Sequence, residues 1–177
     1  MLNQTFLPAS LYRGDEMHQW DIHTDANHYW HPVAAVSHLQ PGEVLAITML
    51  DQPLLLTWPE GEHPRAFRNR CPHRGVAFRH GGATGQSCRR LVCPYHGWTY
   101  NLRGELLAAA READFEQDFD RQGWGLQELS CRIDGPLIWI AFSDQALTLE
   151  EQLQLVHTEA GAAWNTSSTL LRQSRSS

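Results

Sequence analysis

The chain has 177 residues, and its 14 basic side chains against 20 acidic ones give a formal charge of −6. Hydrophobic residues make up 42% and charged residues 19%, which is enough apolar material for one packed domain and excludes wholesale disorder. The acidic balance argues against a general nucleic-acid binder, because phosphate binding needs clustered basic side chains. No apolar run approaches the roughly 20 residues of a membrane span, and the first residues lack a secretory signal pattern. We therefore expect a soluble cytoplasmic protein.

Three segments are expected along the chain, and the first two differ in texture. Residues 1–43 are irregular and predict an arm with one short helix, which Asp25 would cap and Pro32 would end. Residues 44–143 predict short strands separated by turns, because apolar runs such as VLAITML, LLLTW and PLIWIAF alternate with turn residues. The middle of the chain is therefore expected to be a β domain.

The third segment, residues 144–177, carries the clearest helix signal. Thr148 and Glu151 form a capping-box pattern, and apolar residues follow at helical spacing. These features predict a helix from about Leu149 to Ala163. The Ser- and Thr-rich remainder predicts a disordered tail.

Two short segments carry the chemistry of the chain. CPHRG begins at Cys71 and CPYHGW begins at Cys93, with residues 74–92 between the His of the first and the Cys of the second. If the two turns meet, Cys71, His73, Cys93 and His96 offer two sulfurs and two nitrogens. Such a set suits a tetrahedral zinc ion, although zinc sites usually begin with two closely spaced cysteines. It also suits a Rieske [2Fe–2S] centre, with the two cysteines on the buried iron and the two histidines on the outer one.

A resemblance to a known family rests on three stretches, Phe67–Gly75, Cys93–Tyr100 and Leu102–Leu106. They closely resemble the Rieske domain of the large subunit of ring-hydroxylating and related Rieske non-haem iron oxygenases, and the resemblance extends from about Trp30 to Phe142. It implies a mainly β fold, a Rieske-type antiparallel β-sandwich with a small cluster-binding subdomain. It also implies an oxidoreductase with a Rieske-type [2Fe–2S] cluster, and it favours the cluster over zinc.

The other cysteines and histidines near the loops are assigned no ligand role. Cys88 and Cys93 have the C-x₄-C spacing of plant-type ferredoxins, but that pattern needs a further cysteine at the position of His96. Cys88 is expected to be a bystander thiol in a polar loop and Cys131 a core residue. His80 is expected to be a surface histidine.

The loops differ from those of respiratory Rieske domains, which carry a second cysteine in each loop and a serine after the second His-Gly. Here Val76 and Trp98 follow the two glycines, and neither loop has a second thiol. Fewer hydrogen bonds to the sulfurs predict a potential near the lower end of the range of about −150 to +300 mV. That suits an electron carrier fed by a reductase or ferredoxin.

The same comparison suggests roles around the cluster. His73 and His96 are the expected exit for the electron, since each can present its second ring nitrogen outward. Three aromatic residues are expected to shield the cluster: Phe78, Tyr95 and Trp98. Arg74 either anchors an acidic neighbour or partner, or is a solvated surface charge.

The oxygenases that the chain resembles complete their chemistry in a second domain, where two histidines and a carboxylate hold a mononuclear iron. After Trp98 the chain has one histidine, His157, so the downstream sequence does not supply that triad. Upstream, Asp25, His28 and His31 would spread over about 120° of a helix, which is wide for one ion. Solvated or packing histidines are favoured there.

The leading hypothesis is a Rieske [2Fe–2S] electron-transfer component of an oxygenase system. It would pass single electrons from a reductase or ferredoxin toward a mononuclear non-haem iron centre absent from this chain. A self-standing Rieske ferredoxin is the alternative, and a zinc-stabilised interaction domain is the third reading. The expected partners are the electron donor, a separate catalytic oxygenase chain and further subunits of an oligomer, with no nucleic acid and no membrane. Whether the chain is itself an enzyme stays open.

Overall fold

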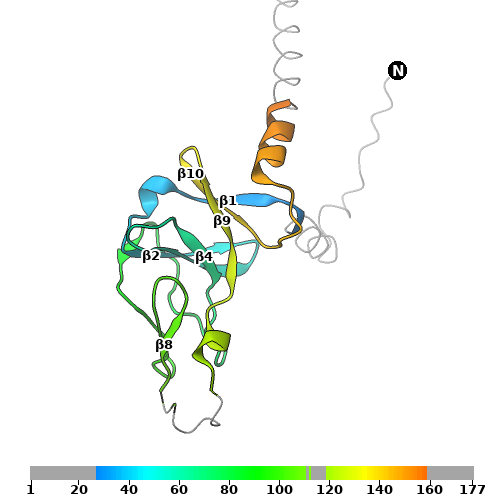
Figure 1. Ribbon diagram of the computed structural model, residues 1–177. Helices are drawn as coiled ribbons and strands as arrows, with labels where there is room; N and C mark the ends of the chain where they lie inside the picture. Colours follow the sequence, from blue (N-terminus) through cyan, green and yellow to red (C-terminus); the bar gives the residue numbers. More distant parts are fainter. Residues whose placement is uncertain (1–26, 111, 113–118, 159–177) are drawn as a thin grey trace, which may run out of the picture.

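The computed structural model describes residues 27–110, 112 and 119–158, and within them two antiparallel sheets (Figure 1). The large sheet contains β1 (Trp30–Ala35), β2 (Glu43–Met49), β3 (Gln52–Trp58), β4 (Arg65–Arg68), β5 (Gln86–Ser87), β9 (Glu128–Asp134) and β10 (Leu137–Ala141). The small sheet contains β6 (Leu91–Val92), β7 (Thr99–Tyr100) and β8 (Leu106–Ala108). Their orders are β1-β10-β9-β4-β3-β2-β5 and β6-β7-β8. The mainly β architecture expected from the sequence is confirmed.

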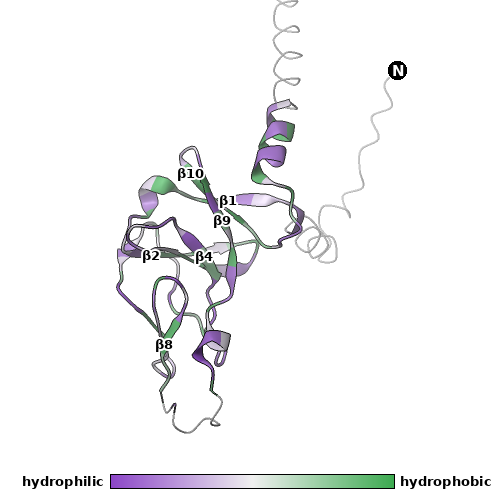
Figure 2. Cartoon of the chain, in the orientation of Figure 1, coloured by the Kyte–Doolittle hydropathy of each residue, from purple (hydrophilic) through white to green (hydrophobic). Residues whose placement is uncertain are grey.

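The small sheet lies at one end of the molecule, marked by β8 in Figure 1, and β1 and β10 lie at the other. Short 3₁₀ helices, η2 (Val36–His38) and η4 (Arg121–Trp124), connect strands, and residues 149–158 are α-helical. Figure 2 shows both polar and apolar residues on that helix, as on an amphipathic helix. None of the helices described is long and apolar enough to cross a membrane.

Strand β3 is buried on both faces, and this explains its unbroken apolar run. Leu54 and Leu56 belong to one core cluster with Ile138 of β10, whereas Leu55 belongs to a second cluster with Trp98 of the small subdomain. A strand that is covered on both sides needs apolar residues at every position rather than at alternate ones. The large sheet thus has a hydrophobic core on each face, and the small sheet packs against one of them.

Strand β1 is a difference from the expected secondary structure, which placed a helix and an arm in this stretch. Residues 27 and 28 are helical, but Trp30–Ala35 then pairs with β10, from Trp30↔Ala141 to Ala35↔Leu137. Pro32 borders an irregularity in the register, and β1 is an edge strand, where a missing N–H is tolerated. The partner lies more than 100 residues further along, so local periodicity does not reveal the pairing. The expected cap, Asp25, lies outside the described residues.

The predicted start of the C-terminal helix is confirmed by its capping box. The backbone N–H of Thr148 donates to the Glu151 carboxylate at 2.9 Å, and the N–H of Glu151 donates to the Thr148 hydroxyl at 3.2 Å. The helix then runs through residues 149–158. The predicted continuation to Ala163 lies outside the described residues.

A side-chain amide holds this helix to the edge of the large sheet. Gln152 accepts the backbone N–H of Trp30 at 2.6 Å and donates its own Nε2 to the Trp30 carbonyl at 2.8 Å. The Trp30 indole also donates to the carbonyl of Leu147 at 2.8 Å. Beneath these bonds Trp30 packs with Ala141 and Leu149 in a third core cluster. The helix therefore covers the outer face of β1 and β10.

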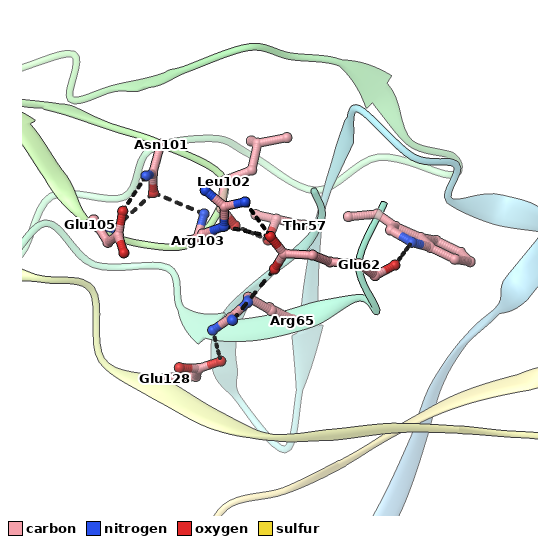
Figure 3. Close-up of polar contacts among 9 residues, drawn as sticks. Thr57, Glu62, Arg65, Asn101, Leu102, Arg103, Glu105 and Glu128 are labelled. Atoms are coloured by element: carbon pink, nitrogen blue, oxygen red, sulfur yellow. Dashed lines mark hydrogen bonds and ion pairs between the residues drawn. The ribbon is translucent and has the colours of Figure 1, made fainter. Parts of the chain in front are cut away.

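Polar contacts fasten the small sheet to the large one (Figure 3). The buried Thr57 hydroxyl donates to the Leu102 carbonyl at 2.7 Å. Glu62 forms ion pairs with Arg103 of the β7–β8 turn and with Arg65 of β4. The two sheets are thus joined by one buried hydrogen bond and by a carboxylate between two arginines.

Candidate metal centre

The segments that begin at Cys71 and at Cys93, the first and second ligand loops, have the same backbone architecture. In the first loop the N–H of Cys71 donates to the Val76 carbonyl at 2.8 Å, and the Cys71 carbonyl accepts from Gly75 at 2.7 Å. The second loop repeats both bonds at the same spacing from Cys93, at 2.8 and 3.0 Å. Each loop is thus a short turn that is held by hydrogen bonds to both the N–H and the carbonyl of its cysteine.

A glycine closes each turn because the chain must enter the left-handed region there. Gly75 has φ +72° and Gly97 has φ +70°. No heavy atom lies within 4 Å of a Cβ built at either position, so space does not require glycine. The backbone conformation alone selects it.

The structure brings the four predicted site residues together as two pairs. The thiols of Cys71 and Cys93 are buried and interact with each other, and the Nδ1 atoms of His73 and His96 lie 3.1 Å apart. Among the described residues, no three His, Cys, Asp or Glu side chains group around one point as a single-ion site would need. The thiol pair lies in the core and the imidazole pair is half-buried.

The surroundings of Cys71 and of His73 disfavour the charged form of each side chain. Burial, and then the neighbouring Cys93 thiol, raise the pKa of Cys71. Burial, and then the charges of His96 and Arg74, lower the pKa of His73. The imidazole is thus kept neutral, the form that ligates a metal, whereas the thiol needs a cation to become a thiolate.

Aromatic rings enclose the imidazole pair. Trp98 stacks on His73 with ring centroids 4.7 Å apart and planes 5° apart, and Tyr95 lies over His96 at 3.8 Å. Trp98 is fully buried and is held edge-on by Trp124 of η4 at 5.2 Å. Of the three residues expected to shield a cluster, Trp98 and Phe78 are buried, whereas Tyr95 is 57% exposed at the tip.

Two further residues, whose roles are not evident from the sequence, support the loops. The hydroxyl of buried Tyr100 lies 3.9 Å from the Cys71 sulfur, and burial raises its pKa. Buried Asn69 accepts the N–H of Phe78 at 2.9 Å and donates to the Arg79 carbonyl at 2.7 Å, which fixes the chain as it leaves the first loop. The sequence signal that could have identified Asn69 is its place as a polar residue two positions before Cys71.

The other two cysteines make contacts unrelated to the imidazole pair. Cys88 is buried, where its sulfur accepts from the Arg79 guanidinium at 3.2 Å and donates to the Arg90 carbonyl at 3.1 Å. Cys131 is half-buried against the core of the large sheet, and burial raises its pKa to about 12. His80 is exposed, as expected.

Of the amino-terminal histidines that the structure describes, His31 packs against an aromatic ring, and His28 takes part through its backbone. The His31 ring lies 5.6 Å from that of Phe142, and the His28 carbonyl accepts the N–H of Leu147 at 3.1 Å. Asp25, the carboxylate considered with them, lies outside the described residues.

Comparison with known proteins gives the same class. The sequence profile described as "Rieske [2Fe-2S] domain" matches residues 29–117, half of the chain. The crystal structure of the apo form of the quaternary ammonium Rieske monooxygenase CntA superposes with a TM-score of 0.75 at 28% identity, covering 84% of this chain and 43% of that one. The chain belongs to the Rieske [2Fe–2S] domain family, whose signature cofactor is a Rieske-type [2Fe–2S] cluster.

Two curated relatives are oxygenase subunits, and this chain spans about two fifths of their length or less. It is 28% identical to the carnitine monooxygenase oxygenase subunit of Acinetobacter baumannii, covering 82% of this chain and 39% of the relative. It is 29% identical to the glycine betaine monooxygenase oxygenase subunit of Chromohalobacter salexigens, covering 83% and 32%. The resemblance to Rieske oxygenase large subunits is thereby confirmed.

Proposed function

We propose that the chain is the electron-transfer component of a Rieske oxygenase system. It takes single electrons from a reductase or ferredoxin and passes them toward a mononuclear non-haem iron centre, for which the residues that the structure describes offer no group of three candidate ligands. The observation that carries this proposal is the paired site, with two buried thiols beneath two half-exposed imidazoles on matching turns.

The donor set fits the cluster. Two thiolates and two neutral imidazoles are the ligands of a Rieske centre, with both sulfurs on one iron and both nitrogens on the other. Cys71 and Cys93 would hold the iron nearer the core, and His73 and His96 the iron nearer the surface. When bound, such a cluster accepts and releases one electron at a time.

The chain's own residues give the site its direction. The two Nδ1 atoms face each other at 3.1 Å, so the Nε2 edges of His73 and His96 lie on the far side of each ring, away from the paired nitrogens. These edges are the shortest covalent route from a metal at Nδ1 to a docked partner. The core around the thiols is apolar and excludes water from the opposite side. Electrons are therefore expected to enter and leave through the Nε2 edges of His73 and His96, which together form the histidine tip.

The proposal is tested by single-turnover kinetics with an oxygenase chain that carries two histidines and a carboxylate around a mononuclear iron. Reduced holo-protein mixed with that chain, its substrate and dioxygen should be reoxidised, with product formed. Reduction by a donor without reoxidation by this partner would contradict the oxygenase role and favour a Rieske ferredoxin that serves another acceptor. A colourless, zinc-loaded protein after aerobic purification would contradict both.

A further inference from the structure

The charge of the chain is distributed very unevenly along its sequence. Residues 63–104, which contain both ligand loops, carry eight arginines and no aspartate or glutamate. The rest of the chain carries six arginines and all 20 acidic residues. The segment with the two ligand loops is thus strongly basic, although the chain as a whole is acidic.

Half of these eight arginines are used inside the fold. Arg65 and Arg103 form ion pairs with Glu62, Arg68 binds the side chain of Gln52, and Arg79 binds Gln86 and Cys88. The other half are exposed and form no ion pair or side-chain hydrogen bond among the described residues: Arg70, Arg74, Arg89 and Arg90. Internal structure therefore does not account for them.

Two of the uncommitted arginines lie in the first ligand loop. Arg70 directly precedes Cys71, and Arg74 directly follows His73 and is close enough for its charge to act on that imidazole. Between them the loop exposes Pro72, as the second loop exposes Pro94 and Tyr95. Exposed aromatic and arginine side chains are the types enriched at the centres of protein interfaces.

We propose that Arg70 and Arg74, on either side of the exposed Pro72 in the first ligand loop, form a docking surface for an acidic electron-donor protein. This inference rests on the proposed function and specifies the partner's charge and the residues that bind it. One electron leaves the reduced donor and enters the oxidised cluster, and no atom is transferred.

The physical role of the two arginines is to orient the encounter. The whole chain, at −6, repels an acidic partner on average, whereas the basic loop attracts it locally. An acidic donor that approaches at random is therefore turned toward the histidine tip. Such steering raises association rates by about 10–10³-fold and is screened when the Debye length falls to a few ångströms at high salt.

The test is stopped-flow reduction of the oxidised holo-protein by a reduced, acidic plant-type [2Fe–2S] ferredoxin. At about 10 mM salt, R74Q should lower the second-order rate constant about threefold and R70Q/R74Q about tenfold. At about 0.5 M salt the variants and the wild type should converge. Calorimetric titration with oxidised ferredoxin, in which no electron moves, should show a matching loss of affinity.

The matched control is R132Q, which removes the same charge from an exposed arginine that pairs with Glu150 near the C-terminal helix. Its rate should equal that of the wild type. A basic probe, cytochrome c as oxidant of the reduced protein, should react at least as fast with R70Q/R74Q as with the wild type. Docking is separated from a change in potential by the convergence at high salt and by the calorimetric loss of affinity, because a lower potential alone would slow the reduction at every salt concentration.

Three outcomes overturn the inference. Equal slowing by R132Q and R74Q would show a bulk charge effect, and an unchanged rate for R70Q/R74Q would show that the loop does not bind the donor; in both cases the proposed function stands. A wild type that dithionite reduces, but that no ferredoxin or reductase reduces at any salt concentration, would overturn both proposals.

Discussion

Three glycines near the site share a left-handed backbone but differ in what surrounds them. Gly97 has φ +70° and open space around its Cα, whereas Gly104 has φ +81° and a Cβ there would lie 2.5 Å from the Phe67 ring. Gly75 resembles Gly97. At the residue scale, the loops thus need glycine for conformation, and the β7–β8 turn needs it also for contact with the large sheet.

This difference predicts a graded loss of stability. Gly97→Ala should cost about 1–2 kcal/mol for the left-handed conformation alone. Gly104→Ala should cost about 1–3 kcal/mol more, because Phe67 must also move. Urea titration of the two holo-proteins compares them directly. Equal losses, or a greater loss for Gly97→Ala, would contradict the account of these turns.

At the element scale, each ligand loop is attached to a strand, and its cysteine is buried in a core to which both sheets contribute. The first loop follows β4 of the large sheet, and the second joins β6 to β7 of the small sheet. Asn69, directly after β4, bonds the backbone of Phe78 and Arg79, and Thr57 of β3 bonds the carbonyl of Leu102, two residues past β7. The thiol and imidazole pairs thus depend on how the two sheets pack, and not on either loop alone.

The C-terminal helix offers an element-scale prediction. Gln152→Ala removes both hydrogen bonds to the Trp30 backbone and should lower the free energy of unfolding by about 1–2 kcal/mol. Hydrogen exchange should rise in residues 149–158 and at the edge strand β1. Gln154→Ala, an exposed position on the same helix, is the control and should change neither quantity. Unaltered exchange in Gln152→Ala would show that the amide does not hold the helix.

The sequence predicted those parts of the fold that local chemistry specifies. The capping box of Thr148 and Glu151 located the start of the helix, and the apolar runs located most strands. It did not reveal β1, because a strand with Pro32 in it is defined by its partner far along the chain. Nor did it reveal the support from Tyr100 and Asn69, because only the packing of the two loops brings these side chains to the site.

At the scale of the whole molecule, Glu62 links the small sheet to the large one, and this link depends on pH. The hydrogen bond from Arg103, followed by the charges of Arg103 and Arg65, holds the pKa of Glu62 below its ordinary value of 4.5. The folded protein therefore binds this proton less tightly than the unfolded chain does. The stabilising contribution is present above pH 4.5 and is lost as the pH falls through the lower, folded value.

Glu62→Gln should accordingly reduce the acid sensitivity of the fold. The urea midpoint of the wild type should fall between about pH 6 and about pH 3 more steeply than that of the variant. Glu60→Gln, at an exposed carboxylate without an ion pair in the described part of the chain, should keep the wild-type slope. Parallel slopes for the wild type and Glu62→Gln would mean that the link does not contribute to stability.

The central claim, that two thiols and two imidazoles hold a Rieske cluster, is tested most directly by electron spin-echo spectroscopy of the reduced protein with ¹⁵N-labelled histidine. We predict coupling to two histidine nitrogens in the wild type and in His80→Ala, an exposed histidine outside the site. His96→Cys, which keeps a ligand at that position, should retain a cluster coupled to one nitrogen. A wild-type spectrum without nitrogen coupling, or two couplings that persist in His96→Cys, would contradict the assignment.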